Sequence, residues 1–532
     1  MKILKKDTTF FLLFFLLGII SRYVLATTKF IHLDAVQYAI GTFHYSLLQH
    51  TPTPPGYFLY IMSAKFLNIF FHDPQRSLVT LSILYSGLIA GVFYLFGKTF
   101  GGMRVGIIAA TLFITSPLYW YKGVTIFGYL NSGFFILLMV FFCYRVVVQK
   151  KAGDMIWASV CFAILLGVRP QELIILIPLY LYVLCHTNLK TVGCSVLIFF
   201  ALCFIWFVPL IYVSGGFDEY IKALSYGRDY LTSDSIFGGG GLSKVNNHLD
   251  RILINLQWLF FLGIVPLVYY LPRFFFLPKI AEDKKVQFFA VWMFPCLIYN
   301  IFLQFGEIGH GMHWGLGFVL ILAEGIVIFY EDLLKMFSLI AEKVSAKIPD
   351  IINHSLFKGV TFAGIIGPII LVNLFLFFHD FSSDDVIVYS EKQFNYAEVS
   401  KTERFLDAKI NFIKENFLPE ETLIIASSAF FRQVMYYFPD AVVIQSSGMT
   451  RKNENTIQYG KNYQRTYYKN KGSFNIPPEI KKGIIFDDFM IPFVNNTTKP
   501  VEHRISRGYK LMSFDLESSR EIFFGYNTIT VL

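Results

Sequence analysis

Asp34 is the first residue whose type and position could do chemistry, and His50 and Tyr57 follow it at short spacing. It is the first carboxylate after an apolar segment long enough to cross a membrane. A carboxylate can take the proton of an attacking hydroxyl group when the two lie within hydrogen-bond reach. We therefore expect Asp34 to be a general base, with His50 and Tyr57 as substrate contacts. The alternative is an exposed aspartate or a helix cap.

A second group consists of cations that lie beside apolar segments. Arg169 directly precedes a proline and Glu172, in a stretch that would otherwise meet lipid. Charge in such a place is costly and is usually functional. We expect Arg169 to bind a phosphate group and Glu172 to orient it, with Lys122 and Arg228 as further contacts. A side chain that only reaches the membrane surface is the alternative for Arg169, and a solvated loop residue is the alternative for Arg228.

A third group contains His310, His313 and Asn131. The two histidines form a His-x-x-His pair close to Glu307, a pattern that can bind a metal ion. Flanking glycines indicate a loop instead, in which the histidines would contact a substrate. Asn131 stands at the mouth of another apolar segment, where its amide can donate and accept hydrogen bonds but supplies no charge.

The composition shows which kind of scaffold carries these residues. Hydrophobic residues make up 55% of the 532 positions and charged residues 16%, against about 25% in a soluble protein. The aromatic content of 18% excludes a disordered chain. The net charge of +9 is spread between apolar runs, which argues against a nucleic-acid-binding stripe. All six cysteines fall inside apolar runs, without disulfide or zinc spacing. The chain is therefore expected to be a membrane protein.

The apolar runs predict a polytopic α-helical membrane protein of about 11 spans. The expected spans are 10–26, 78–96, 105–121, 132–148, 155–168, 173–185, 192–213, 252–271, 286–303, 315–330 and 360–378. A further run, 56–71, is short and contains Lys65. If it lies in the outer interface without crossing, the cytoplasmic side receives most of the lysines and arginines, as the positive-inside rule requires. The first run also resembles a signal peptide, but Arg22 near its end favours a retained anchor.

The domain organisation follows from a change of composition near Asp380. Residues 1–379 are expected to form the transmembrane module, with an outer interfacial loop at 27–77. Residues 380–532 are more polar and alternate strand-like and helix-like segments, which predicts an α/β domain. The topology places this domain on the extracytoplasmic side of a cell membrane (inner or plasma membrane).

Several motifs together resemble a known family. Asp34 after the first span, Tyr38-Ala39, Pro54-Pro55-Gly56-Tyr57, Gly97-Lys98-Thr99-Phe100-Gly101-Gly102, Ser116-Pro117 and Val168-Arg169-Pro170 occur in this order. The pattern is similar to that of GT-C fold membrane glycosyltransferases, the group of the protein O-mannosyltransferases and the lipid A aminoarabinose transferases. The similarity extends over the first two thirds of the chain.

The resemblance implies an inverting glycosyltransferase that moves a hexosyl or pentosyl unit from a polyprenyl-phosphate carrier to a glycan, lipid or protein acceptor. It matches Asp34 to the family's catalytic aspartate and leaves a divalent cation as an open question. Two positions depart from the family pattern, Asn131 where an acidic residue is common and Thr53 where a histidine is common. The alternatives are a lipid-linked polysaccharide polymerase or ligase and a lipid or polysaccharide transporter. The latter would show paired repeats.

Overall fold

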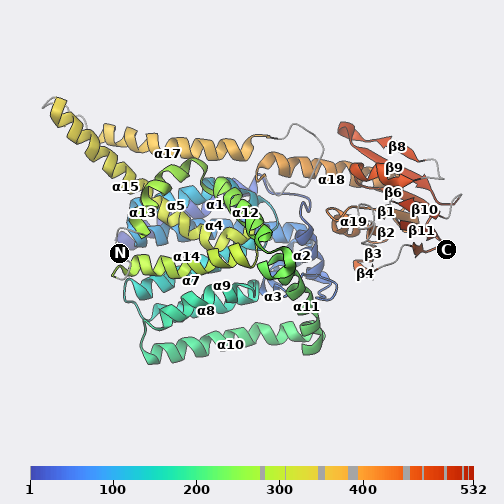
Figure 1. The fold of residues 1–532 in the computed structure, drawn as a ribbon, viewed down its shortest axis with the longest axis horizontal. Coiled ribbons are helices and arrows are strands. Elements are labelled where there is room, and N and C mark those ends of the chain that lie inside the picture. The colour runs from blue at the N-terminus through green and yellow to red at the C-terminus, as the bar shows by residue number, and fades with distance from the viewer. Residues whose placement is uncertain are drawn as a thin grey trace. The chain divides into compact units, whose positions relative to one another are not determined.

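A computed structural model describes residues 2–275, 282–305, 307–344, 354–381, 393–446, 456–469, 473–495, 500–517, 521–524 and 527–531. The chain divides into two compact units (Figure 1). The helical unit comprises Met1–Ala26, Pro54–Phe381 and Ser390–Glu398, and the sheet unit comprises Thr27–Thr53, Ser382–Tyr389 and Val399–Leu532. Each unit is considered by itself below.

The helical unit is a bundle of α-helices joined by short connections. Its helices are α1 (Lys2–Tyr23), α3 (Phe58–Phe71), α4 (Pro74–Gly101), α5 (Met103–Thr115), α6 (Pro117–Val124), α7 (Tyr129–Val147), α8 (Asp154–Val168), α9 (Glu172–Leu184), α10 (Leu189–Val213), α11 (Phe217–Asp234), α12 (Leu242–Phe260), α13 (Ile264–Phe275), α14 (Lys284–Phe302), α15 (Met312–Val344) and α17 (Ser355–Phe378). Three short helical turns, η1 (Ile236–Gly240), η2 (Phe261–Gly263) and η3 (Ile308–Gly311), interrupt the series.

The membrane class is confirmed. Within the described residues, seven helices are long and apolar enough to cross a membrane, or eight if the bent pair α5–α6 is one span. The seven are Pro74–Gly101, Tyr129–Val147, Leu189–Val213, Leu242–Phe275, Lys284–Phe302, Gly309–Ala341 and Ser355–Phe378. The other predicted spans, 10–26, 155–168 and 173–185, coincide with α1, α8 and α9.

Three apolar helices are short for a full crossing. α3, α8 and α9 have 14, 15 and 13 residues, so each is about 20 Å long, against about 30 Å for the hydrocarbon core. The length of α3 agrees with a segment that does not cross. Because α8 and α9 are equally short, length alone does not distinguish them from α3.

Prolines determine where two helices end near the candidate site. Ser116-Pro117 separates α5 from α6, and the two axes differ by 59°. α8 ends at Val168, and its C-cap Arg169 is not helical because the ring of Pro170 disfavours a helical conformation at the preceding residue. Both breaks lie toward the end of the bundle that the sequence predicts to be external, and Ser116 and Arg169 are buried there.

Pairs of glycines allow the first helices of the bundle to approach closely. A Cβ atom at Gly18 on α1 would lie 2.8 Å from the Cα of Gly87 on α4, so the backbones of these two helices are in contact there. A Cβ atom at Gly97 on α4 would lie 2.7 Å from the Cα of Gly106 on α5, so these two helices are also in backbone contact. Small residues at such crossings are typical of helix packing in membranes.

The sheet unit contains two sheets. Its strands are β1 (Thr422–Ile425), β2 (Val442–Ser446), β3 (Thr456–Lys461), β4 (Gln464–Lys469), β5 (Ser473–Ile476), β6 (Lys482–Ile485), β7 (Val494–Asn495), β8 (Val501–Arg504), β9 (Lys510–Asp515), β10 (Glu521–Phe524) and β11 (Asn527–Val531). The larger sheet has the order β4-β3-β2-β1-β6-β9-β8 and the smaller β5-β11-β10-β7. β1 runs parallel to β2 and β6, and all of its residues are buried. The predicted α/β domain is present.

Three helices complete this unit. They are α2 (Leu33–Phe43), α18 (Tyr396–Asn416), which enters the unit at Val399, and α19 (Phe431–Tyr437), with the short turns η4 (Pro419–Glu421), η6 (Asp488–Phe493) and η7 (Ser506–Gly508). The compact units divide the predicted outer loop 27–77. Residues 27–53, with α2, group with the C-terminal domain, whereas α3 belongs to the bundle. The reason is that α2 packs against α19.

Candidate functional site

Seven side chains meet at one end of the helical bundle. They come from the end of α6, the start of α7, the junction of α8 and α9, and the chain that leads into α15. We call this group the cation–aromatic cluster, and it contains Lys122, Tyr129, Arg169, Glu172, Glu307, His310 and His313. The sequence analysis named six of these residues, all but Tyr129, and the structure brings those six together.

Glu172 lies between the guanidinium group of Arg169 and the imidazole ring of His313. Its Oε1 is 3.4 Å from Arg169 Nε, and its Oε2 is 2.7 Å from His313 Nδ1. The Glu172 side chain is fully buried, and those of Arg169 and His313 are 4% and 2% exposed. Buried charges of this kind require partners of opposite sign or hydrogen bonds. The expectation that Glu172 orients Arg169 therefore has a geometric basis, and Glu172 also fixes His313.

The ring of Tyr129 contacts both cations of the cluster, Lys122 and Arg169. The Arg169 guanidinium carbon lies 4.3 Å from the Tyr129 ring centroid, and Lys122 Nζ lies 5.0 Å from it. Lys122 Nζ is also 3.4 Å from the ring centroid of Phe127. These distances are within the range of cation–π attraction. The Tyr129 hydroxyl donates a hydrogen bond of 2.9 Å to Glu307 Oε2.

The two histidines present different nitrogens. His310 Nδ1 accepts the backbone N–H of Glu307 at 3.2 Å, so the hydrogen of a neutral ring lies on Nε2. His313 Nδ1 faces the Glu172 carboxylate, so Nδ1 carries the hydrogen and Nε2 of a neutral ring has the lone pair. One histidine is thus prepared to donate from Nε2 and the other to accept there.

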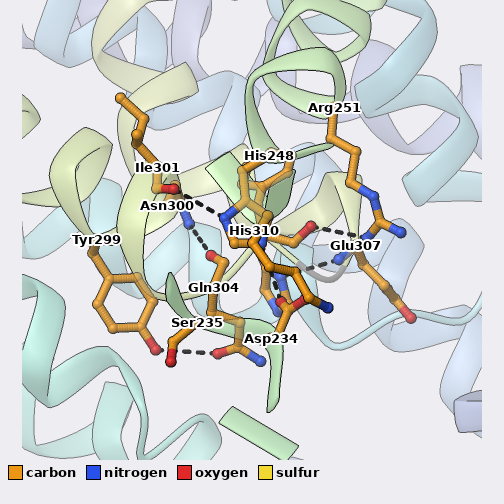
Figure 2. A network of polar contacts seen from close by, with 12 residues as sticks. Asp234, Ser235, His248, Arg251, Tyr299, Asn300, Ile301, Gln304, Glu307 and His310 are labelled. Carbon is orange, nitrogen blue, oxygen red and sulfur yellow. Dashed lines mark hydrogen bonds and ion pairs between the residues drawn. The ribbon is translucent and has the colours of Figure 1, made fainter. Parts of the chain in front are cut away.

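The chain between α14 and α15 is held by a polar network (Figure 2). His248 Nδ1 on α12 donates to the carbonyl of Ile301 at 3.0 Å, and Arg251 donates to the carbonyl of Phe305 at 2.9 Å. Asn300 donates to the carbonyl of Gln304 at 2.9 Å. His248 Nε2 also lies 3.4 Å from Asp234. The network anchors the segment that carries Glu307 and His310.

Three other predicted residues take separate positions in the helical unit. Asn131 is buried on α7, and its Oδ1 has no hydrogen-bond partner among the described residues. Tyr57 precedes α3, and its hydroxyl accepts a 2.8 Å hydrogen bond from Gln171, next to Arg169. Arg228 lies on α11 with an exposed side chain and takes no part in the contacts that define the cluster.

Asp34 and His50 lie in the sheet unit. Asp34 is the second residue of α2, and its backbone N–H donates to His32 Nδ1 at 3.1 Å, so His32 is the helix cap. A carboxylate in the first turn is favoured by the helix dipole. His50 is buried, and burial together with the charges of Arg465 and Arg432 lowers its pKa to about 3. His50 is therefore neutral at physiological pH.

His32 and Asp34 supply two potential metal ligands. Their donor atoms lie within 4.8 Å of one another. Imidazole nitrogen and carboxylate oxygen both suit divalent transition metals, so the donor types fit a cation. Catalytic sites of zinc commonly use three protein ligands, so these two would need further ligands.

With this geometry established, the chain can be compared with known proteins. It superimposes on the oligosaccharyltransferase of Archaeoglobus fulgidus in its apo form with a TM-score of 0.50, at 11% identity over 82% of this chain and 64% of that one. The fold is that of the GT-C glycosyltransferases. ArnT from Cupriavidus metallidurans bound to undecaprenyl phosphate gives a TM-score of 0.49, at 9% identity over 86% of this chain and 97% of that chain.

The superposition on the archaeal enzyme in its apo form confirms, for the fold alone, the GT-C resemblance drawn from the sequence. The archaeal enzyme in complex with an inhibitory peptide and a dolichol-phosphate gives a TM-score of 0.46, at 12% identity over 82% of this chain and 64% of that one. The chain therefore spans about two thirds of the length of the archaeal enzyme. No family model matches the chain, and no curated protein matches it in sequence.

The sequence did not identify Tyr129 as part of the site. An aromatic residue beside an apolar segment is usually core or interface, so its type gave no signal. Its position, seven residues after Lys122 at the mouth of the next helix, was the available clue. In the structure the Tyr129 ring also lies against Gly309, where a Cβ atom would be 2.2 Å from the ring.

Proposed function

We propose that this protein is an inverting glycosyltransferase that moves a sugar from a polyprenyl-phosphate carrier to an acceptor hydroxyl on the outer face of a cell membrane. The observation that supports this most is the cation–aromatic cluster at one end of a GT-C bundle. It gathers Lys122, Arg169 and two histidines where the helices end. A phosphate leaving group gains charge as its bond to the sugar breaks, and fixed cations stabilise that charge.

The proposed reaction is a single displacement. The acceptor oxygen forms a bond to the anomeric carbon while the bond from that carbon to the phosphate oxygen breaks. Asp34 takes the hydroxyl proton, and the carrier leaves as polyprenyl phosphate. Attack from the face opposite the leaving group inverts the anomeric configuration. A divalent cation, if bound by His32 and Asp34, would add positive charge near the reacting groups.

The cluster residues have separate roles in this proposal. Arg169 binds the phosphate with its planar guanidinium group, and Lys122 adds a point charge. Glu172 holds Arg169 and His313 in place. His310 donates from Nε2 to a phosphate or sugar oxygen. Asn131 supplies an amide at the position where an acidic residue is common in the family that the sequence resembles.

Asp34→Asn tests the role of the base. The variant keeps the shape of the side chain and removes the proton acceptor, so sugar release from polyprenyl-phosphate sugars should fall about 10²- to 10⁴-fold. Binding of undecaprenyl phosphate should stay unchanged. Asp250→Asn is the matched control, because Asp250 is an exposed carboxylate on α12. Transfer is measured in membranes with equal amounts of each protein, over a panel of monosaccharide donors.

Two outcomes would contradict the proposal. Wild-type turnover in Asp34→Asn would exclude Asp34 as the base. Carrier binding by the wild-type protein without sugar release from any donor, but with movement of the carrier between leaflets, would identify a transporter.

A further inference from the structure

The start of loop 27–53, which carries Asp34, is fastened to α18. The backbone N–H groups of Thr28 and Lys29 both donate to Glu403 Oε1, that of Lys29 at 3.3 Å. The Thr28 hydroxyl donates to the same oxygen at 3.2 Å. One turn further along α18, Asp407 lies 2.9 Å from Lys29 Nζ. A single carboxylate thus satisfies two backbone donors of the loop, which would otherwise need water or other partners.

The next residues of the loop contact α19. The Phe30 backbone N–H donates to the Tyr437 hydroxyl at 3.2 Å. The Phe30 ring is fully buried, and its edge meets the ring of Tyr436 at 4.8 Å between centroids. The helix that follows, α2, buries eight consecutive residues, from Ala35 to Thr42, and packs against α19.

The end of the loop is held by the hairpin β3–β4. Asn462 and Tyr463 connect the two strands with φ angles of 51° and 63°, as a two-residue hairpin turn with both central residues at positive φ requires. This turn brings Tyr463 to Phe43, with ring centroids 5.1 Å apart. The backbone N–H of Arg465 donates to Gln49 Oε1 at 2.8 Å.

The loop also closes on itself. Ser46 and Thr51 exchange backbone hydrogen bonds of 2.7 and 2.9 Å. A Cβ atom at Gly41 would lie 3.1 Å from the ring of Pro52, so the returning chain lies directly on α2. The Thr53 hydroxyl donates to Gln37 on the same helix. Asp34 therefore sits on a compact segment that has contacts with the C-terminal domain at its start, middle and end.

We propose that the C-terminal domain is the scaffold that positions Asp34, and that Glu403 is a positioning residue at the start of its loop. This inference rests on the proposed function only where sugar transfer is measured. It gives the C-terminal domain a role in the chemistry that needs no contact between that domain and the substrate. The effect of Glu403 on the loop can be measured by hydrogen exchange, without any measurement of sugar transfer.

The experiment follows backbone hydrogen exchange of residues 28–43 in the full-length protein in nanodiscs. Glu403→Ala removes the acceptor of both N–H groups, so exchange at Thr28 and Lys29 should rise about ten-fold or more. Glu403→Gln keeps a carbonyl oxygen and should restore most of the protection. Glu415→Ala, an exposed glutamate on the same helix, is the control and should change nothing.

Sugar transfer is measured on the same samples. Glu403→Ala should lower kcat several-fold with unchanged binding of undecaprenyl phosphate, and Glu403→Gln should recover it. Unchanged exchange in a folded Glu403→Ala protein would overturn the proposal, as would a loosened loop with wild-type turnover. If Glu403→Ala does not fold, Tyr463→Leu tests the other end of the loop by the same two measurements. If the wild-type protein transfers no sugar, the proposed function fails and the exchange data still decide whether Glu403 holds the loop.

Discussion

The two ends of the helical bundle hold their cations in different ways. At one end, three cations each contact a carboxylate: Lys98 contacts Asp7 at 2.5 Å, Arg145 contacts Asp154 at 2.8 Å, and Lys285 contacts Glu324 at 2.5 Å. At the other end, Lys122 and Arg169 lie against the Tyr129 ring. There Arg169 shares the carboxylate of Glu172 with His313.

Part of this difference is the kind of partner that each cation has. A lysine at 2.5 Å from its own carboxylate is largely neutralised. An aromatic ring attracts a cation through its quadrupole and leaves the net charge in place. The second end also contains two carboxylates, Glu172, which Arg169 and His313 share, and Glu307, which accepts the Tyr129 hydroxyl. Comparing matched substitutions at the two ends therefore tests whether the cations beside Tyr129 bind a ligand and those at the other end only maintain the fold.

Removing a carboxylate gives the largest expected difference between the ends. Glu172→Gln leaves Arg169 and His313 buried with a neutral amide, which should cost about 3–5 kcal/mol of stability. Asp7→Asn at the opposite end breaks a partly exposed pair, with side chains 33% and 24% exposed, and should cost less than about 1 kcal/mol. The measurement is the thermal unfolding midpoint in detergent. Equal shifts for the two variants would mean that the ends do not differ in this respect.

Removing a cation should affect ligand binding at one end only. Arg169→Ala should weaken binding of undecaprenyl phosphate about 10- to 100-fold, because a charge-assisted hydrogen bond to phosphate is lost. Arg169→Lys should recover part of it, since a point charge replaces the planar guanidinium group. Arg145→Ala at the opposite end is the control and should leave binding unchanged. If Arg169→Ala bound undecaprenyl phosphate as well as the wild type, Arg169 would not bind the phosphate, and its side chain would only reach the membrane surface.

Much of the helical scaffold could be predicted from the sequence, because hydrophobic runs of spanning length have few other solutions. Each of the predicted spans is helical in the structure. The end of α8 at Val168 agrees with the predicted end of the span 155–168. The predicted span 105–121 ran through Ser116-Pro117, where the structure bends by 59° between α5 and α6. The contact between Arg169 and Glu172 followed from their spacing of three residues, which places side chains close together at a helix end.

Contacts between distant parts of the sequence could not be predicted in this way. Nothing in the spacing of Glu172 and His313, or of Tyr129 and Glu307, indicates that they meet. The grouping of loop 27–53 with the C-terminal domain was also missed. That grouping depends on Glu403 and Tyr463, which in the sequence are an ordinary glutamate on an amphipathic helix and an ordinary tyrosine.

Tyr129 offers the smallest and most specific test of the difference between the ends, because its ring contacts both cations. Tyr129→Leu removes the ring, so binding of undecaprenyl phosphate should weaken about 5- to 30-fold as Lys122 and Arg169 lose their support. Tyr129→Phe keeps the ring and removes only the hydrogen bond to Glu307. Binding by the phenylalanine variant should stay within about three-fold of wild type.

Gly309→Ala tests the role of the Tyr129 ring without changing Tyr129 itself. The added Cβ atom would lie 2.2 Å from the ring, so the Tyr129 ring must move although its chemistry is unchanged. The variant should therefore reproduce the weakened binding of Tyr129→Leu. If Tyr129→Phe were as weak as Tyr129→Leu, the hydroxyl and Glu307 would be the important partners. If all three variants bound like wild type, the cations would not depend on the ring, and the contrast between the two ends would rest on Glu172 alone.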